Sequence, residues 1–379
     1  MSNAKLLPVK VGILGGGQLA RMLALSAYNL GLRPYVFVRS MDECAVEVAA
    51  EAFIDDQSVE SLAKFYDKVD VLVIENEFVD LALLQAVLGA KPLYPSLDCL
   101  QLVQNKLDQK NNLKKYKIPT LDFIPVRSLE DIHKVEEKFG PSFVLKKAQF
   151  GYDGRGTFII QGKDKFDYET FKKDYSSFNG YAEPLAKFKK EIAVIVARSI
   201  TGETNCYPII ETHQENGMCQ WTMIPAGIPK NIVKKAQDIA QKVIKKFEGI
   251  GVFGVEMFWL NNGDVVVNEI APRVHNSGHI TMNACTVSQF EQHWRAVLGY
   301  SLGDTNLAVK AGAMMNIIGA IQKDQSRITF DKAHAQSWIH WYGKAGATLG
   351  RKLGHVNVVG KNSVHALALA KKVRKVIDV

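Results

Sequence analysis

A predicted β-hairpin in the second half of the chain constrains fold and function more than any other feature of the sequence. Two apolar runs flank the dipeptide Asn262-Gly263, which is the strongest short-range signal for a two-residue hairpin turn. A turn at that dipeptide would place Glu256 directly opposite Glu269. Opposed residues on antiparallel strands have Cβ atoms roughly 5 Å apart, so two carboxylates there repel each other unless a cation lies between them.

The hairpin leads into a polar segment that extends the same candidate site. This segment contains, within seven residues, Arg273, His275, Asn276, Ser277 and His279. Mg²⁺ usually binds one or two carboxylates together with substrate phosphates. We therefore predict a metal site at Glu256 and Glu269, with Asn268 beside them. The alternative is an exposed hairpin whose two acids point into water, which the neighbouring polar segment disfavours.

Length and charge narrow the functional class. The chain has 379 residues, enough for two or three domains. Its 47 Lys and Arg against 39 Asp and Glu give a net charge of +8, spread along the chain. A modest, dispersed excess suits anionic small molecules better than nucleic acid, whose binders concentrate basic residues on one face. We expect small-molecule substrates and no nucleic-acid partner.

Cysteine content and hydropathy indicate the compartment. Five scattered cysteines without a Cys-x-x-Cys pair argue against disulfides and zinc sites and favour a reducing environment. No apolar run reaches membrane-spanning length, and no leader-like segment opens the chain. We therefore expect a cytoplasmic protein with no membrane partner.

The order of the predicted elements divides the chain into three blocks. In residues 1–104 strands alternate with helices, which implies a parallel sheet of the Rossmann-like α/β type. Residues 105–181 contain a strand, a glycine-rich loop and a return strand, an arrangement typical of a flap. Residues 182–379 hold the hairpin, a strand-rich tail and a final helix. The expected fold class combines α/β and α+β architecture.

The first glycine-rich turn predicts an anion site rather than a dinucleotide site. Glycines 15–17 follow a strand and precede a helix that begins near Gln18. Free N–H groups and the helix dipole at such a junction favour phosphate. A dinucleotide site needs an acid at the end of the second strand, where this chain has Arg39. We predict a phosphate seat for another ligand, with a purely structural turn as the alternative.

A second glycine-rich loop, residues 151–156, has the composition of a phosphate cover. Its glycines let the backbone close over a polyphosphate, while Lys146 on the preceding strand supplies a point charge. Glu183 and Glu191 flank a predicted chain turn and suit the polar ends of a nucleoside. A structural hairpin turn and ordinary surface acids are the alternatives.

Basic side chains gather among four glycines of the tail. They are Lys344, Arg351, Lys352 and His355. The glycine density argues for close approach of the backbone to a ligand. A solvated basic loop is the alternative.

Together these segments resemble the ATP-grasp enzymes, and most closely the N5-carboxyaminoimidazole ribonucleotide synthetase family. The resemblance covers almost the whole chain and rests on residues 12–19, 151–156, 191–198 and 254–258. Its most specific part is the twelve-residue polar motif 268–279, followed by residues 288–292. It implies an ATP-grasp fold with a Rossmann-like N-terminal domain of the biotin-carboxylase type (1–104), a flap domain (105–181) and a C-terminal ATP-grasp domain (182–379).

The resemblance also implies the residues of connected sites for ATP, metal and ribotide. ATP would contact Lys106, Lys146, Gly151, Tyr152, Asp153, Gly154, Arg155, Gly156, Glu183, Leu185, Glu191, His213, Asn268 and Glu269. The ribotide would contact Gly15, Gly16, Gly17, Gln18, Leu19, Glu75, Tyr152, Arg273, His275, Asn276, Ser277, Lys344, Arg351 and Lys352. Glu256 and Glu269 would hold the metal. Asp153 would orient the amine or take its proton, while Arg273 and Lys352 would hold the anionic intermediate.

The implied reaction is ATP-dependent carboxylation of 5-aminoimidazole ribonucleotide by bicarbonate through carboxyphosphate, a step of purine biosynthesis. Its cofactors would be ATP and Mg²⁺, with Mn²⁺ as a substitute. The family also implies a homodimer and a product passed to a separate mutase. The alternatives are another ATP-grasp ligase, such as a formate-dependent glycinamide ribotide transformylase or a biotin-dependent carboxylase, an NAD-binding oxidoreductase, and a catalytically silent nucleotide sensor.

Three positions depart from the family pattern. Phe150 stands where a glycine is common, Lys106 stands where an arginine is expected, and the aromatic residue between Glu75 and Glu77 is replaced. The second departure puts the phosphate contact of Lys106 in doubt. None of the three touches the metal carboxylates or the polar motif.

Overall fold

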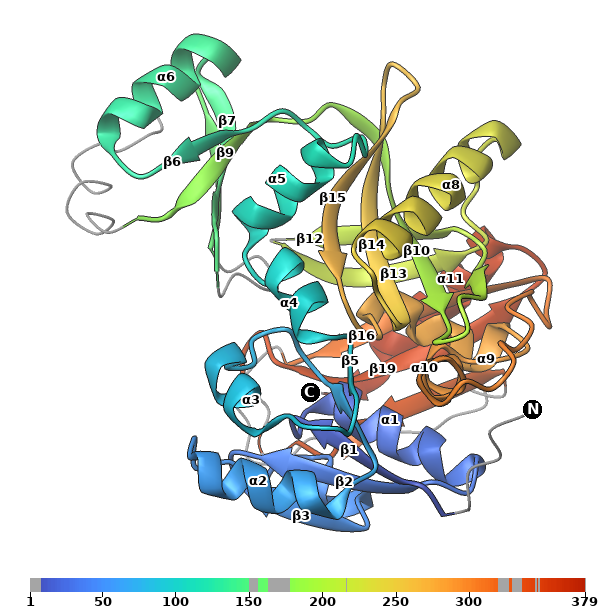
Figure 1. The fold of residues 1–379 in the computed structure, drawn as a ribbon. Coiled ribbons are helices and arrows are strands. Elements are labelled where there is room, and N and C mark those ends of the chain that lie inside the picture. Colours follow the sequence, from blue (N-terminus) through green and yellow to red (C-terminus); the bar gives the residue numbers. More distant parts are fainter. Residues whose placement is uncertain are drawn as a thin grey trace.

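The computed structural model of the chain contains three principal β-sheets with helices packed against them (Figure 1). It describes residues 8–149, 156–162, 178–215, 217–319, 327–328, 336–344, 346 and 348–378. A fourth, two-stranded sheet joins β17 (Arg327–Ile328) to β20 (Ile377–Asp378). Within these ranges we find no helix that combines the length and the apolar character needed to cross a membrane.

A five-stranded sheet forms the N-terminal part of the molecule, with the order β3-β2-β1-β4-β5 and parallel pairing throughout. Its strands are β1 (Lys10–Leu14), β2 (Arg33–Val38), β3 (Glu51–Ile54), β4 (Val71–Ile74) and β5 (Leu93–Tyr94). Between and after them lie α1 (Gln18–Asn29), η1 (Val46–Val48), α2 (Val59–Lys68), α3 (Leu81–Val87) and α4 (Leu97–Val103). The predicted Rossmann-like sheet is confirmed.

Helices cover both faces of this sheet. Helix α1 packs on one face, where Leu23 and Val11 share an apolar cluster. Helix α2 packs on the other face, where Phe65 and Leu72 share a second cluster. Parallel strands buried on both faces need near-continuous apolar sequence, which explains why β4 is apolar at every position.

A four-stranded antiparallel sheet follows, with the order β6-β9-β7-β8. Its strands are β6 (Ile124–Val126), β7 (Ser142–Lys147), β8 (Thr157–Gln161) and β9 (Gly180–Pro184). Helix α6 (Leu129–Phe139) covers it, capped by Ser128 and ended by Gly140 at φ +80°. The predicted β7–β8 hairpin is confirmed, while the glycines at its tip, residues 151–154, lie outside the described residues.

The largest sheet has nine strands among the described residues, in the order β15-β14-β10-β12-β13-β16-β19-β18, with β11 paired to β10. The strands are β10 (Phe188–Arg198), β11 (Thr204–Cys206), β12 (Ile210–Glu215), β13 (Met218–Ile224), β14 (Gly251–Leu260), β15 (Val265–Ala271), β16 (Ala311–Ile318), β18 (Ser337–Trp341) and β19 (Lys352–Gly360). The helical segments around it are α5 (Lys106–Lys115), α8 (Lys230–Lys246), η3 (Asn276–Ile280), α9 (Thr281–Ala284), α10 (Gln289–Leu298) and α11 (Ser363–Lys375). Strand β15 is one edge of this sheet.

The N-terminal sheet and the large sheet share a core. A single apolar cluster contains residues of α1, β10 and α10. At its centre the fully buried Trp294 donates its indole N–H to the carbonyl of Leu23 at 2.9 Å. This contact satisfies the one polar group of a large aromatic side chain, so the two parts of the chain pack as one body around the site described next.

Candidate active site

The site is built on the β14–β15 hairpin, where Glu256 pairs with Glu269 as predicted. The turn expected to set this register is different, however. Leu260 donates its N–H to the carbonyl of Asp264, so the loop between them holds three residues rather than two. Its last residue, Gly263, has φ +92°, as three-residue hairpin loops require. The prediction of a two-residue turn is therefore wrong.

A β-bulge on β15 shifts the register back by one residue, so that the two acids are paired as predicted. Met257 pairs with Val267, whereas Glu256 pairs with Glu269, which leaves Asn268 as an extra residue on β15. A bulge lets two consecutive side chains face the same side of a sheet. Asn268 and Glu269 accordingly both line the pocket, while Val267 is buried in the core beneath.

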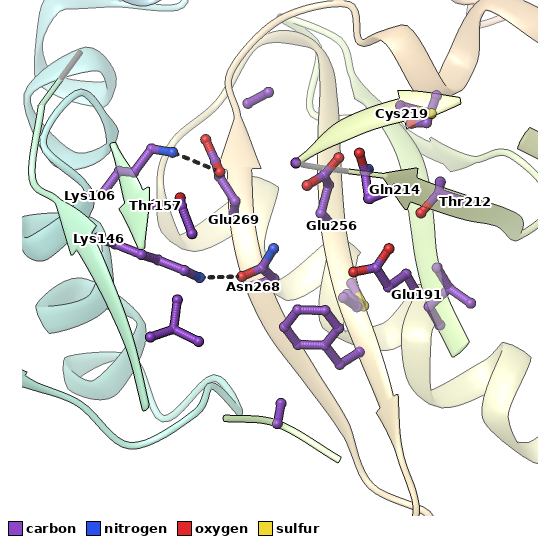
Figure 2. A pocket seen from close by; sticks show the side chains of 18 of the residues that line it. Lys106, Lys146, Thr157, Glu191, Thr212, Gln214, Cys219, Glu256, Asn268 and Glu269 are labelled. Atoms are coloured by element: carbon purple, nitrogen blue, oxygen red, sulfur yellow. Dashed lines mark hydrogen bonds and ion pairs between the residues drawn. The ribbon is translucent and has the colours of Figure 1, made fainter. Parts of the chain in front are cut away.

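These residues line a pocket of about 630 Å³ between the small sheet and the large sheet (Figure 2). Its walls come from β7, β8 and β9 on one side and from β10, β12, β14 and β15 on the other. The predicted site residues on its wall are Lys106, Lys146, Glu183, Leu185, Glu191, Glu256, Asn268, Glu269, Arg273, His275, Asn276, Ser277 and Lys352. The structure thus brings together residues from all three predicted sites.

Two lysines face the bulge from across the pocket. Lys106 Nζ lies 2.9 Å from Glu269 Oε2, and Lys146 Nζ donates to Asn268 Oδ1 at 2.8 Å (Figure 2). Burial alone would raise the pKa of Glu269, but Lys106 outweighs it and holds that pKa below the usual value. The lysine at position 106 therefore supplies the positive charge expected there from an arginine.

Glu256 is held differently from its partner. Burial first, and then the charges of Glu269 and Glu191, raise its pKa to about 7. His275 Nε2 lies 3.5 Å from Glu256 Oε1. Two facing carboxylates of which one resists ionisation form an oxygen cluster that fits a divalent cation. Among the described residues no three His, Cys, Asp or Glu side chains gather into a ready-made metal site. Mg²⁺ held by one or two carboxylates usually also binds water and substrate phosphates.

We expect the Mg²⁺ affinity of the nucleotide-bound chain to increase as the pH rises through about 7. A cation needs the ionised carboxylate, and the raised pKa of Glu256 keeps that group mainly protonated below this pH. Titration calorimetry with MgADP in buffers of different ionisation enthalpy measures the released proton. In Glu256→Gln the pH dependence should vanish; a dependence that persists there would assign the proton to another group.

The same pKa shift predicts the opposite trend for the ligand-free chain. A carboxyl group with a raised folded pKa stabilises the fold at low pH, and this contribution is lost as the pH rises through the folded value. The free energy of unfolding without metal should therefore fall between about pH 4.5, the ordinary pKa of the group, and about pH 7, its pKa in the folded chain. Denaturant titrations at several pH values, with Glu256→Gln as the control, measure this.

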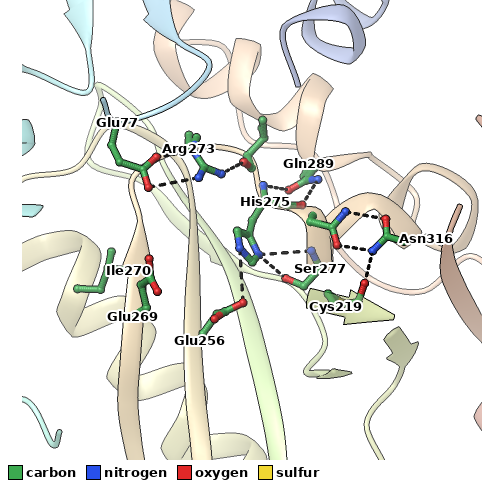
Figure 3. A network of polar contacts seen from close by, with 12 residues as sticks. Glu77, Cys219, Glu256, Glu269, Ile270, Arg273, His275, Ser277, Gln289 and Asn316 are labelled. Atoms are coloured by element: carbon green, nitrogen blue, oxygen red, sulfur yellow. Dashed lines mark hydrogen bonds and ion pairs between the residues drawn. The ribbon is translucent and has the colours of Figure 1, made fainter. Parts of the chain in front are cut away.

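Behind Glu256, a buried amide network fixes the polar motif (Figure 3). Gln289, fully buried, accepts from the N–H of His275 at 2.9 Å and donates to its carbonyl at 2.7 Å. Ser277 donates its N–H to His275 Nδ1. A neutral ring that accepts at Nδ1 carries its proton on Nε2, which is the nitrogen nearest Glu256.

Asn276 is held by a second amide. Asn276 and Asn316 exchange two hydrogen bonds of 3.0 and 2.9 Å, and Asn316 also donates to the carbonyl of Cys219 (Figure 3). Gln289 and Asn316 were not predicted as site residues. Gln289 belongs to the sequence motif 288–292, but Asn316 lies in an apolar strand, where no local signal marks it.

Arg273 reaches across to the N-terminal sheet. Its Nε donates to Glu77 Oε2 at 2.6 Å and its NH2 group to Glu77 Oε1 at 3.3 Å (Figure 3). Both side chains are largely buried, with exposed fractions of 15% and 9%. The arginine predicted to hold an anionic intermediate is thus already held by a carboxylate, and Glu77 was not among the predicted site residues.

The first glycine-rich turn also binds a carboxylate. Glu75 accepts from the N–H of Gly17 at 2.7 Å and from the N–H of Leu19 at 3.3 Å. A Cβ at Gly15 or Gly17 would overlap this carboxylate. An acid of the chain itself therefore already bonds to these two amides, and the phosphate seat at this turn stays a prediction.

Contact of the ribotide with the rest of this turn stays a prediction. Gly16 and Gln18, like the amides bound to Glu75, do not line the described pocket. A Cβ at Gly16 would meet Glu43 and Val38. The glycines are thus needed for close packing, whatever they bind.

The remaining predicted residues are spread around the pocket. Lys352 is buried on β19 and lines it, whereas Arg351 is exposed and Lys344 packs over the ring of Tyr342. His213 stacks on Trp221 with ring centroids 4.9 Å apart and does not line the pocket. The flap residues Gly151, Tyr152, Asp153, Gly154 and Arg155 lie outside the described residues, and Gly156 follows them at φ +82°. Their roles stay predictions.

Comparison with known proteins identifies the family. Three family models match in succession: a ribonucleotide synthetase preATP-grasp domain over residues 9–104, an ATP-grasp domain over 111–290 and a phosphoribosylaminoimidazole carboxylase C-terminal domain over 312–368. The N5-carboxyaminoimidazole ribonucleotide synthase of Synechococcus elongatus is 35% identical over 356 residues, covering 92% of this chain and 89% of the relative. The chain belongs to the N5-carboxyaminoimidazole ribonucleotide synthase family. This confirms the resemblance drawn from the sequence.

Solved members of the synthase family share the fold. The N5-carboxyaminoimidazole synthase of Aspergillus clavatus, in complex with ADP and 5-aminoimidazole ribonucleotide, superposes with a TM-score of 0.84 at 32% identity. The match covers 97% of this chain and 98% of that one. The predicted ATP-grasp fold is confirmed.

Some relatives of this synthase-family chain are longer. The phosphoribosylaminoimidazole carboxylase of Candida albicans is 37% identical over 365 residues, which cover 92% of this chain but only 63% of the relative. The chain thus spans less than two thirds of the length of these fungal relatives.

Helix α5 contributes two buried polar residues that were also not predicted. Gln109 accepts from the N–H of Ile270 at 2.9 Å and donates to its carbonyl at 3.0 Å. Lys110, which is buried, donates to Thr120 and to the carbonyl of Val267. These contacts give hydrogen-bond partners to backbone groups at the edge of β15, around the bulge. The signal in the sequence was that this helix is strongly polar on more than one face, so that some of its polar side chains must point inward.

Proposed function

We propose that the chain uses ATP and bicarbonate to carboxylate 5-aminoimidazole ribonucleotide, which yields N5-carboxyaminoimidazole ribonucleotide, ADP and phosphate. The observation that carries the proposal is the pocket in which two facing carboxylates, Glu256 and Glu269, lie opposite Lys106 and Lys146. The Aspergillus relative, with its ADP and 5-aminoimidazole ribonucleotide, supports the same pair of ligands.

The charges of the pocket suit phosphoryl transfer to bicarbonate. Lys146 and Lys106 would bind the phosphates and orient the terminal phosphoryl group toward the bicarbonate oxygen. Glu256 and Glu269 would hold Mg²⁺, which would neutralise charge on the transferring group. The oxygen of bicarbonate forms a bond to phosphorus, the bond to the ADP oxygen breaks, and carboxyphosphate results.

The polar motif suits the second step. The exocyclic amine of the ribotide forms a bond to the carboxyl carbon, the bond from that carbon to the phosphate oxygen breaks, and the amine loses a proton. Arg273 and Lys352, which line the same pocket, would hold the anionic intermediate. Asp153 is our choice for the proton acceptor. A closed flap would keep water from the mixed anhydride.

One assay tests this function. ATP hydrolysis by the wild-type chain should require 5-aminoimidazole ribonucleotide and bicarbonate together, and carboxylated ribotide should form in equal amount to ADP. Turnover with formate and glycinamide ribotide, or with a biotinyl acceptor, would assign the chain to another ATP-grasp reaction. Tight NADH binding without ATP turnover would overturn the proposal.

We also propose the division into N-terminal, flap and ATP-grasp domains, the homodimer, the cytoplasmic location and delivery of the product to a separate mutase. The boundary between the second and third domains is better drawn after Pro184 than at residue 181, because β9 pairs with β6 and β7 of the small sheet. Light scattering of the purified chain tests the dimer. A coupled assay with added mutase tests the transfer.

A further inference from the structure

A buried series of charges behind the pocket links Lys146 to helix α5. Lys146 Nζ lies 2.6 Å from Glu183 Oε2, in addition to its bond to Asn268. The other oxygen of Glu183 forms an ion pair with Lys110. The side chains of Glu183 and Lys110 are each only 1% exposed. The carboxylate expected near the nucleoside therefore lies between two lysines.

The charges in this cluster do not cancel. Glu183 contributes one negative charge, while Lys110 and Lys146 contribute two positive ones. Burial alone would raise the pKa of Glu183, but the two lysines lower it below its usual value, so the carboxylate is ionised. Of the two lysines, Lys146 is the one that lines the pocket, and its side chain is 16% exposed. The net positive charge is thus presented to a ligand there.

Lys110 also fixes the backbone that supports Lys146. Thr120 Oγ1 accepts from Lys110 at 2.7 Å and donates to the carbonyl of Val267 at 2.9 Å. Val267 immediately precedes Asn268, the bulge residue to which Lys146 donates. The same buried lysine therefore contacts the carboxylate on one side of Lys146 and the strand that carries its amide partner on the other.

We propose that Lys110 is a positioning residue for nucleotide binding. Its ion pair with Glu183 offsets the negative charge of that carboxylate, so the positive charge of Lys146 remains available for the phosphates of ATP. In a low-dielectric interior, an acid with a single lysine partner would neutralise that lysine. Glu183 then pairs with the two lysines rather than contacting the nucleoside. The inference rests on the ATP use proposed above.

The variant Lys110→Met tests the role of the charge. It should weaken MgADP binding, measured by titration calorimetry, by about tenfold or more, since a charge-assisted phosphate contact is lost. The Michaelis constant for the ribotide should stay within about twofold. Lys110→Arg should keep most of the affinity. Lys115→Met, an exposed lysine of the same helix, is the matched control and should bind MgADP like the wild type.

The double variant Lys110→Met/Glu183→Gln separates charge balance from packing. Removal of both charges leaves Lys146 without a competing carboxylate, so MgADP affinity should recover most of what Lys110→Met lost. A double variant that binds no better than Lys110→Met would overturn the proposal, as would unchanged affinity in Lys110→Met itself.

The single variant Glu183→Gln provides an independent test of the proposal if Lys110→Met does not fold. The proposal expects MgADP to bind at least as tightly as to the wild type, whereas a carboxylate that contacts the nucleoside would give weaker binding when neutralised. A wild-type chain that binds MgADP without carboxylating the ribotide would overturn the proposed function and leave these binding tests valid. A wild-type chain that binds no MgADP would overturn both.

Discussion

Replacement of Glu269 by glutamine is expected to lower ATP turnover by about a hundredfold to a thousandfold, the cost of removing one group that stabilises transition-state charge. Glu269 faces Glu256 across the ladder and bonds to Lys106 at 2.9 Å. A neutral amide binds Mg²⁺ far more weakly than a carboxylate and leaves Lys106 without its counter-charge. Phosphate release, measured against Mg²⁺ concentration with ribotide and bicarbonate saturating, gives the effect directly.

The control for this loss is an acid of the same chain outside the pocket. Glu60 on α2 is 78% exposed and pairs with Lys64 on the same helix, so Glu60→Gln should leave turnover unchanged. Circular dichroism and thermal unfolding would show that both variants fold. Near-normal, Mg²⁺-dependent turnover in Glu269→Gln would mean that the metal lies elsewhere.

The sequence predicted those parts of the fold that depend on local patterns. Alternating strands and helices predict the parallel sheet, and the capping residues of α6, Ser128 and Gly140, are read directly from residue type. The short strands β3 and β5 cannot be read from the sequence in this way, because each is completed by pairing with a neighbouring strand of the sheet. Their few residues carry no periodic signal of their own.

The pairing of Glu256 with Glu269 was predicted correctly for an incomplete reason. The three-residue loop shifts the register by one position, and the bulge at Asn268 shifts it back. Neither shift is visible locally, because Gln109 and Lys110, more than 150 residues away from the bulge, hold the edge of β15 in place. A register can be read from a turn only when the strands beyond it are regular.

The contact of the glycine-rich turn with an acid of the chain was invisible for a similar reason. The residues of the turn have the geometry of an anion site, and the chain supplies an anion itself through Glu75, 58 residues away. Arg273 likewise meets Glu77, 196 residues away. Sequence patterns identify groups that attract charge, but only the fold decides whether a ligand or another side chain meets them.

Arg273 provides the second large expected effect. In Arg273→Met the carboxylate of Glu77, which is 9% exposed, loses its bidentate partner. An unpaired buried charge typically costs about 3 to 5 kcal/mol, so we expect the free energy of unfolding to fall by about that amount, and carboxylation of the ribotide to be lost. Urea titration measures the first and product formation the second. Arg21→Met, which breaks an ion pair with the 60% exposed Glu47, should cost much less.

The double variant Glu77→Gln/Arg273→Met distinguishes the structural role of Arg273 from its proposed role in the reaction. With both charges gone, most of the lost stability should return, because no unpaired ion is left in the interface between the N-terminal sheet and the polar motif. Carboxylation should not return, because the guanidinium proposed to hold the anionic intermediate is still missing. Arg273→Lys should keep a charge beside Glu77 but lose the planar fork, and so recover stability better than activity. If instead the double variant regained both stability and turnover, Arg273 would serve only to join the two parts of the chain, and Lys352 would be left as the group that holds the intermediate.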